Sequence, residues 1–163
     1  MSRDIAQEFL LSNDFDPDGF KVAIIASRFN TDITDRMVTG AIACLNVNGF
    51  KKDSVEIIHV PGAWELPQAT STVLRLDRHD AIITLGCVIR GETPHFDYVC
   101  STANDGIAAV ARNATIPIVF GVLTTDTYEQ ALKRAGEGQA NKGYEAAMAA
   151  LQMIDLYDRL AAN

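Results

Sequence analysis

Four short apolar runs constrain the fold of this chain more than any other feature. They cover residues 21–27, 55–60, 81–89 and 116–122, and most of them do not alternate polar with apolar side chains. Such runs are typical of strands that are buried on both faces of a parallel sheet. A stretch with helical character follows each of them. The pattern therefore predicts an α/β fold.

The segments between the runs define the rest of the architecture. Helices are expected at residues 31–48, 65–76, 95–113, 126–135 and 141–160. Right-handed crossovers would place these helices on both faces, which gives a three-layer α/β/α sandwich around a central four-stranded parallel sheet. Pro117 cannot donate a ladder hydrogen bond, so the fourth strand should lie at an edge. Thr124 or Thr125 is the expected cap of the fourth helix.

The last helix carries one apolar stripe. Its members recur at spacings of four and three residues, which is one face of a helix. They are Ala146, Ala150, Met153, Tyr157 and Leu160.

Length and composition limit the class of protein. A chain of 163 residues suits one domain, with residues 19–163 as the domain and residues 1–18 as a loose arm or an added edge strand. The net charge of −7 argues against nucleic acid as a partner, because phosphate backbones require clustered Lys and Arg. No apolar run approaches the roughly 20 residues that span a bilayer, so no membrane association is expected.

The amino terminus and the cysteines predict the compartment. Residues 1–18 are acidic and have no basic n-region, so a signal peptide is not expected. Cys44, Cys87 and Cys100 are widely spaced, which is typical of free thiols in the cytoplasm and offers no metal cluster. The sequence thus predicts a cytoplasmic protein without a metal site.

The turn after the third apolar run is the strongest candidate for chemistry. Gly91, Glu92 and Thr93 connect that run to the next helix, at the carboxyl edge where open α/β sheets bind ligands. Free N–H groups at a helix start attract anions, phosphate above all. Arg90 and His95 flank the turn. An anion site and a titratable group would therefore lie close together.

Several familiar sites are absent from the sequence. Residues 27–30 lack a glycine fingerprint for a dinucleotide, and neither a Walker loop nor a Gly-x-Ser-x-Gly motif is present. The first and third strands end in Ser27 and Ile89, whereas a receiver domain would need acidic residues there.

Four clusters remain, each at the carboxyl end of a strand: residues 28–30, 61–67, 86–97 and 120–125. Phe29, Trp64 and the apolar pair at 88–89 could enclose a flat heterocycle. Glu65 could bind hydroxyl groups, and His95 could transfer protons near neutral pH.

A structural role is the alternative for each of these residues. Aromatic side chains such as Phe29 and Trp64 often belong to a core. His95 could be a cap or a surface residue, and Glu65 could complement the dipole of its helix. Arg134 could be a solvated partner of its helix end. The convergence of all four clusters on one edge of the sheet favours the functional interpretation.

Five motifs, in order, resemble those of one family over residues 21–160. They are residues 28–30, 61–67, 86–99 and 120–124, and residues 134–136 together with 141–143. On these motifs the chain is similar to the lumazine synthases, the 6,7-dimethyl-8-ribityllumazine synthase family of riboflavin biosynthesis. The resemblance implies a flavodoxin-like fold and a transferase that needs no cofactor.

The resemblance also implies a reaction. 5-Amino-6-(D-ribitylamino)uracil would condense with 3,4-dihydroxy-2-butanone 4-phosphate to give 6,7-dimethyl-8-ribityllumazine. The amine attacks the ketone, water leaves, phosphate is eliminated and the ring closes. His95 would be the catalytic residue that moves protons in the last two steps.

The resemblance assigns substrate contacts to further residues. Those for the pyrimidine and ribityl group would be Phe29, Ala63, Trp64, Glu65, Cys87, Val88, Ile89 and Phe120. Those for the phosphate would be the N–H groups of Glu92 and Thr93 and the guanidinium of Arg134, which suits an anion bidentately. Phe120 and Arg134 would come from a neighbouring subunit.

The resemblance finally implies a homo-oligomer. Family members are homopentamers, some of which assemble twelve pentamers into a shell of sixty subunits, and riboflavin synthase is a candidate partner. The unchanged length of the 136–141 turn favours a shell, but Glu137 and Gln139 replace the usual turn residues and leave the free pentamer open. Trp64 is larger than the phenylalanine of well-known members, which affects how it stacks.

Two further classes of protein compete with the enzyme. One is a flavin- or lumazine-binding module on the same fold without turnover, and the other is a purely shell-forming protein. His95 and Arg134 discriminate between them, because neither a binder nor a shell needs these residues.

Overall fold

A computed structural model of the protein describes residues 11–163. The prediction of an arm or edge strand at residues 1–18 falls mostly outside the described residues. From Leu11 to Lys21 the chain has neither helix nor strand, and Leu11, Phe15 and Phe20 pack against the domain core. Within residues 11–163, no helix is both long enough and apolar enough to cross a membrane.

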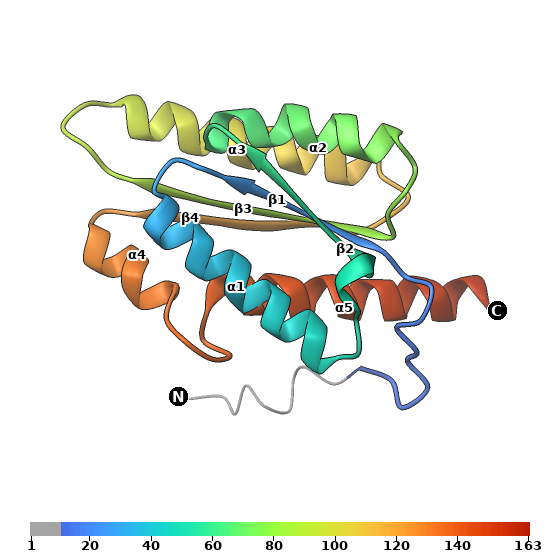
Figure 1. Cartoon of the computed structure of the whole chain (residues 1–163). Helices are drawn as coiled ribbons and strands as arrows, with labels where there is room; N and C mark the ends of the chain where they lie inside the picture. The colour runs from blue at the N-terminus through green and yellow to red at the C-terminus, as the bar shows by residue number, and fades with distance from the viewer. Residues whose placement is uncertain (1–10) are drawn as a thin grey trace, which may run out of the picture.

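Four parallel strands form the centre of the molecule (Figure 1). They are β1 (Val22–Ser27), β2 (Val55–Val60), β3 (Ala81–Ile89) and β4 (Ile118–Thr125), in the spatial order β2-β1-β3-β4. All of β1 and most of β3 are buried, as expected for central strands that are covered on both faces. The predicted four-stranded parallel sheet is confirmed.

The position of β4 at an edge is also confirmed, although its bounds differ from those expected. Pro117 lies just before the strand, where its carbonyl accepts a hydrogen bond from the Ile82 N–H at 2.9 Å. At the other end the strand continues through Thr124 and Thr125. These two residues therefore do not cap the following helix, and Thr127 does so by accepting from the Gln130 N–H.

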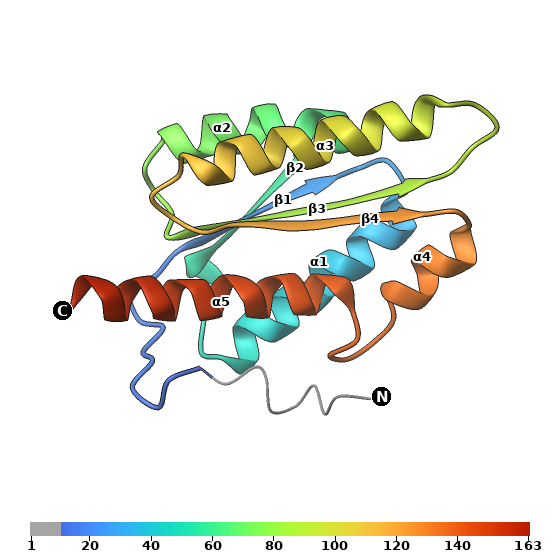
Figure 2. The same cartoon turned by 180° about the vertical axis from the view of Figure 1, so that it is seen from behind.

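Helices cover both faces of the sheet (Figures 1 and 2). They are α1 (Thr31–Val47), α2 (Leu66–Arg75), α3 (His95–Arg112), α4 (Tyr128–Arg134) and α5 (Lys142–Ala161). α2 and α3 lie on one face, and α1, α4 and α5 lie on the other. Two apolar clusters, one under each layer, form the core. The three-layer α/β/α sandwich is confirmed.

Glycine allows α1 and α5 to approach each other closely. A Cβ at Gly143 would collide with the backbone carbonyl of Met37, so only glycine fits where the two helices meet. Asn141 stabilises this contact, because its side chain donates to the Arg36 carbonyl and accepts from the Gly143 N–H. The contact fixes the start of α5 beside α1.

Only the first half of the apolar stripe of α5 is buried. Ala146 and Ala150 are buried, but Met153 is only partly buried, and Tyr157 and Leu160 are exposed. The buried positions continue instead through Leu151 and Ile154. Figure 2 shows the reason, because the last turns of α5 run beyond the sheet and have no strand above them.

Candidate active site

The carboxyl ends of β1 and β3 form the point where the strand order reverses. From β1 the chain crosses to β2 on one side, and from β2 it returns over β1 to β3 on the other. The helices after these strands diverge to opposite faces there, which opens a crevice. A hollow of about 440 Å³ lies at this edge, within the range of small-molecule sites.

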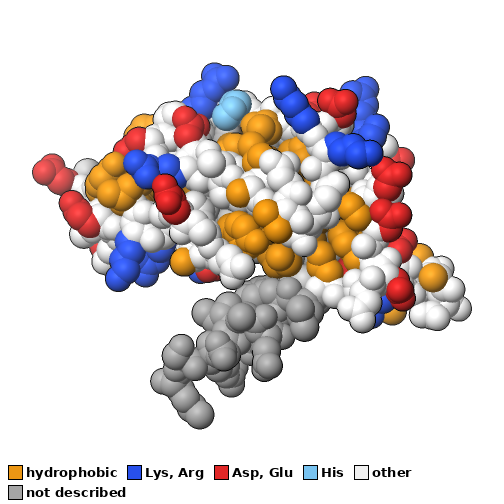
Figure 3. Space-filling view, turned by 60° about the horizontal axis from the view of Figure 1, so that its bottom comes forward, with side chains coloured by type: hydrophobic (Ala, Val, Ile, Leu, Met, Phe, Trp, Pro, Cys, Tyr) orange, Lys and Arg blue, Asp and Glu red, His pale blue; other side chains and the backbone are white. Residues whose placement is uncertain are grey.

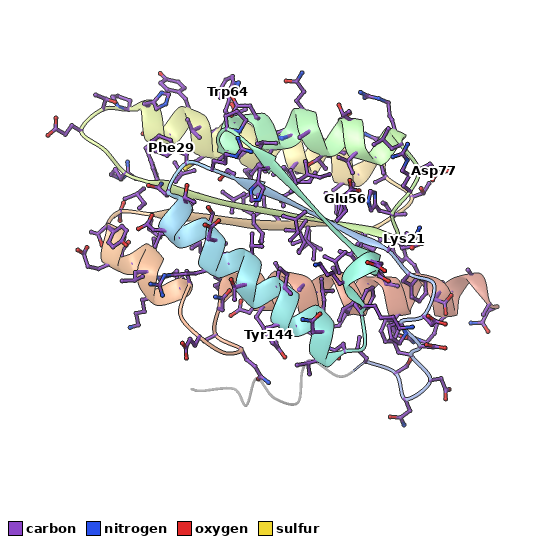
Figure 4. The ribbon with its side chains drawn as sticks, in the orientation of Figure 1. Lys21, Phe29, Glu56, Trp64, Asp77 and Tyr144 are labelled. Carbon is purple, nitrogen blue, oxygen red and sulfur yellow. The ribbon has the colours of Figure 1, made fainter. Side chains whose placement is uncertain are left out.

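Three strand ends supply the lining of this hollow, which we call the main hollow. Its lining is formed by Phe29, Pro61, Gly62, Ala63, Trp64, Glu65, Cys87, Val88, Ile89, Gly91, Thr93, His95, Phe96 and Val99. Figure 4 shows Phe29 and Trp64 at the same end of the sheet, far from Lys21, Glu56 and Asp77 at the opposite end. The sequence clusters at residues 28–30, 61–67 and 86–97 therefore meet.

Backbone hydrogen bonds join the loops that carry the two aromatic side chains. The N–H of Arg28 donates to the Val60 carbonyl at 2.8 Å, and the N–H of Phe29 donates to the Pro61 carbonyl at 3.0 Å. The β1–α1 turn is thus fixed to the loop that begins before Trp64. Phe29 is 71% exposed and Trp64 55% exposed, so neither is a core residue and both offer a free ring to a ligand.

Asn30 connects the same turn to β3. Its backbone is left-handed with φ 60°, a conformation that Asn adopts more readily than most residues. Its side-chain amide donates to the carbonyl of Cys87 at 2.9 Å. Because Cys87 lines the main hollow, this bond sets the distance between the Phe29 turn and the floor of the hollow.

Cys87 forms part of that floor as a buried neutral thiol. Burial, with a smaller contribution from the nearby Asp32 carboxylate, raises the pKa of Cys87 to about 12. Because the thiolate is the nucleophilic form of cysteine, this side chain is not suited to covalent catalysis near neutral pH.

Glu65 combines a structural contact with free bonding capacity. Its Oε2 accepts a hydrogen bond from the Gly62 N–H at 2.9 Å and so closes the loop before α2. A carboxylate can accept several hydrogen bonds, so the second oxygen remains available to a ligand hydroxyl. The structural interpretation of Glu65 and the ligand-binding one are therefore compatible.

The start of α3 has the features of a candidate anion-binding element. The helix begins at His95, and no described side chain caps it. The first N–H groups of such a helix need partners from outside the helix. Thr93 and His95 lie on the surface at the rim of the main hollow. Glu92 is exposed in the same turn but is not among the lining residues.

Phe120 and Arg134 lie outside the main hollow in the folded chain. They line a second hollow of about 510 Å³ between β4 and α5, which also includes Lys142 and Glu145. The two hollows share no lining residue. Within one chain, the structure therefore does not bring Phe120 and Arg134 together with His95.

Phe96 and Val99 are among the residues of the main hollow to which the sequence motifs assign no contact. They are three residues apart on the first turns of α3 and therefore lie on one face of that helix. That spacing, just after the candidate anion turn, was the available signal. Among residues 11–163, no three His, Cys, Asp or Glu side chains are grouped so that they could hold a metal ion.

These features define a class of protein. The chain has an α/β fold of the flavodoxin-like type, a class whose members bind small molecules at the carboxyl edge of a parallel sheet. The profile of the 6,7-dimethyl-8-ribityllumazine synthase family matches residues 19–158. The chain therefore belongs to the 6,7-dimethyl-8-ribityllumazine synthase family.

Individual relatives agree with this assignment. The 6,7-dimethyl-8-ribityllumazine synthase of Nautilia profundicola is 51% identical over 140 residues, which cover 86% of this chain and 91% of the relative. Those of Chlorobaculum tepidum and Desulfatibacillum aliphaticivorans are 48% and 46% identical over 142 residues, each covering 87% of this chain and 92% of the relative. The chain is accordingly a transferase that catalyses the penultimate step of riboflavin biosynthesis, and the interpretation as a binder or shell protein without turnover is not favoured.

Proposed function

We propose that the main hollow is where 5-amino-6-(D-ribitylamino)uracil condenses with 3,4-dihydroxy-2-butanone 4-phosphate. One observation carries this proposal. A single hollow combines two exposed aromatic rings, a carboxylate with a free oxygen, and a histidine beside an uncapped helix start. These are the groups that a flat ring, a polyol chain and a phosphate ester require.

The pyrimidine ring would lie between Phe29 and Trp64. Both rings are exposed, and backbone hydrogen bonds join the segments that carry them, so the backbone positions from which the rings project are fixed before a substrate binds. Backbone groups of Ala63, Cys87, Val88 and Ile89 would bind the polar edge of the pyrimidine. The free oxygen of Glu65 would accept hydrogen bonds from ribityl hydroxyls.

The phosphate of the second substrate would bind at the start of α3. The N–H groups of Glu92 and Thr93 would donate to its oxygens, which suits the exposed position of the turn. The role of Glu92 is limited to its backbone, so it does not require the side chain to line the hollow. This placement would leave the reacting carbons next to His95.

His95 would transfer protons during the later steps. After the amine has attacked the ketone and water has left, a carbon-bound proton must be removed so that phosphate can be eliminated. Ring closure then needs a second proton transfer. An imidazole can do both near neutral pH, and His95 is exposed at the rim where the two substrates would meet.

The complete site would be shared between two subunits. Phe120 and Arg134 line a hollow of their own beside β4 and α5, and Phe120 is 43% exposed although it is a large apolar residue. We propose that this hollow faces the main hollow of a neighbouring copy. Phe120 would then close over the pyrimidine, and Arg134 would reach the phosphate.

A direct assay tests this function. Purified protein is mixed with both substrates, and formation of 6,7-dimethyl-8-ribityllumazine is followed by its fluorescence. We expect turnover well above the rate without protein, and no product when either substrate is left out. Binding of the product with no increase in its rate of formation would instead identify a binding module.

We expect the chain to be a homopentamer at least, because the shared site requires neighbouring copies. Figure 3 shows hydrophobic side chains exposed in the middle of the α1–α5 layer, which is typical of a surface that another protein covers. Light scattering coupled to size-exclusion chromatography measures the mass. A monomer with full activity contradicts the shared site, whereas a free pentamer contradicts only the sixty-subunit shell and implicates Glu137 and Gln139.

A further inference from the structure

Arg90 makes the most extensive set of side-chain contacts near the proposed phosphate site, yet it is not among the described residues that line the main hollow. Its Nε donates to Oδ1 of Asp126 at 2.8 Å, and its Nη1 lies 3.4 Å from Oδ1 of Asp97. Its Cζ lies 4.3 Å from the centroid of the Phe96 ring, a cation–π contact.

These contacts join three separate segments. Arg90 follows the last residue of β3, and its N–H donates to the Thr125 carbonyl at 2.9 Å. Phe96 and Asp97 belong to the first turn of α3, and Asp126 belongs to the connection between β4 and α4. One guanidinium therefore connects the end of β3, the start of α3 and the end of β4.

The turn between these points has little support of its own. Residues 91–95 are all exposed, and a Cβ at Gly91 would meet no atom within 4 Å. The position of this turn therefore depends on its two ends, and Arg90 holds both of them. Small displacements of positioning groups can cost about a hundredfold in rate.

Arg90 also balances negative charge. Asp97 and Asp126 are exposed carboxylates close to a turn that we expect to bind phosphate. Without Arg90, both carboxylates would lose their ion pairs with its guanidinium. Their field would then repel an anion at the start of α3 and would act over roughly the 8–10 Å Debye length of physiological buffers.

We propose that Arg90 is a positioning residue for the phosphate end of the site. It fixes the 91–94 turn and the first turn of α3, and it offsets the charge of Asp97 and Asp126. The proposal rests on the proposed function, because it concerns the affinity of that same site for the phosphorylated substrate. It gives Arg90 no contact with either substrate.

Arg90→Gln tests the proposal in the full-length oligomer. We expect the KM for the butanone phosphate, and the inhibition constant of inorganic phosphate, to rise about tenfold, while the KM for the pyrimidine stays within about twofold. Part of the rise should disappear at high salt, because screening weakens the repulsion by the two carboxylates. Arg112→Gln, which makes the same change at the exposed far end of α3, is the matched control and should leave all these constants unchanged.

A double variant separates charge from simple loss of structure. Arg90→Gln combined with Asp126→Asn removes one of the two unpaired carboxylates, so we expect it to bind inorganic phosphate more tightly than Arg90→Gln alone. Arg90→Lys keeps the charge but not the planar fork. Arg90→Lys should give an intermediate rise in KM that is confined to the phosphorylated substrate. If Arg90→Gln does not assemble, Arg90→Lys is used for the test instead.

The outcomes distinguish this proposal from the function on which it rests. If the wild-type protein forms no lumazine, the proposed function is wrong. If the wild type is active, three results overturn the role of Arg90: unchanged constants in Arg90→Gln, an equal rise of both KM values, or no recovery of phosphate binding in the double variant.

Discussion

Replacing His95 with alanine is expected to slow lumazine formation by about 10²-fold to 10⁴-fold, the usual contribution of a general acid–base group. The side chain lies at the rim of the main hollow, beside the turn proposed to bind phosphate. Without its imidazole, solvent must remove and return the protons of the elimination and of ring closure. Steady-state rates from lumazine fluorescence, measured at saturating concentrations of both substrates, provide the value.

The pH dependence of kcat tests the same role of His95 independently of how large the loss of rate is. If His95 transfers protons, the wild-type profile should contain a limb that is absent from His95→Ala. His59→Ala is the matched control, because His59 is exposed on β2 and lines neither the main hollow nor the second hollow. A His95→Ala protein with the wild-type rate and the wild-type pH profile would exclude His95 as the proton-transfer group.

Replacing Arg134 with alanine should raise the KM for the phosphorylated substrate by about tenfold to a hundredfold. Hydrogen bonds to charged groups are worth about 1.5–3 kcal/mol, which corresponds to that range. Within one chain the guanidinium donates through Nη1 to the Gln130 carbonyl of its own helix at 3.0 Å. Since a guanidinium has five N–H donors, most of them remain for a phosphate. Binding of the pyrimidine should remain nearly intact.

Two comparisons make the Arg134 result specific. Lys133→Ala removes the neighbouring exposed cation and should leave both KM values near wild type. Mixed oligomers of His95→Ala and Arg134→Ala chains should regain activity, because some shared sites then combine an intact His95 with an intact Arg134 from the next copy. Equal weakening of both substrates in Arg134→Ala would indicate a structural role, and no recovery in mixed oligomers would contradict a site built from two subunits.

Much of the fold follows from local signals in the sequence. The apolar runs placed the four strands, because a strand buried on both faces needs no polar side chains. Pro117 predicted an edge position for the last strand, and β4 does lie at an edge, although the strand begins only after this proline, at Ile118. The cluster at residues 61–67 and the turn at residues 91–93 marked the ligand edge, since the carboxyl ends of parallel strands meet there.

Only the tertiary structure decided which positions of the periodic apolar stripe on α5 are buried. Tyr157 and Leu160 continue the helical stripe of α5 but are exposed, because α5 outruns the sheet that buries Ala146 and Ala150. The spacing of apolar residues describes a helix face, whereas burial depends on whether another element lies opposite that face.

For the candidate site, too, sequence and tertiary structure determine different properties. From sequence alone, Arg134 and His95 belong to one list of strand-end and helix-end residues, and no local pattern tells how far apart they lie. The folded chain puts them on two hollows with no residue in common. In the sequence Arg90 is only a cation that flanks the 91–93 turn. In the folded chain its side chain joins β3, α3 and the β4–α4 connection. The sequence determined which chemical groups reach the carboxyl edge of the sheet. The packing of strands and helices decided which of these groups can meet within one subunit. The reason is that the distance between two residues depends on how their elements pack and not on their order along the chain.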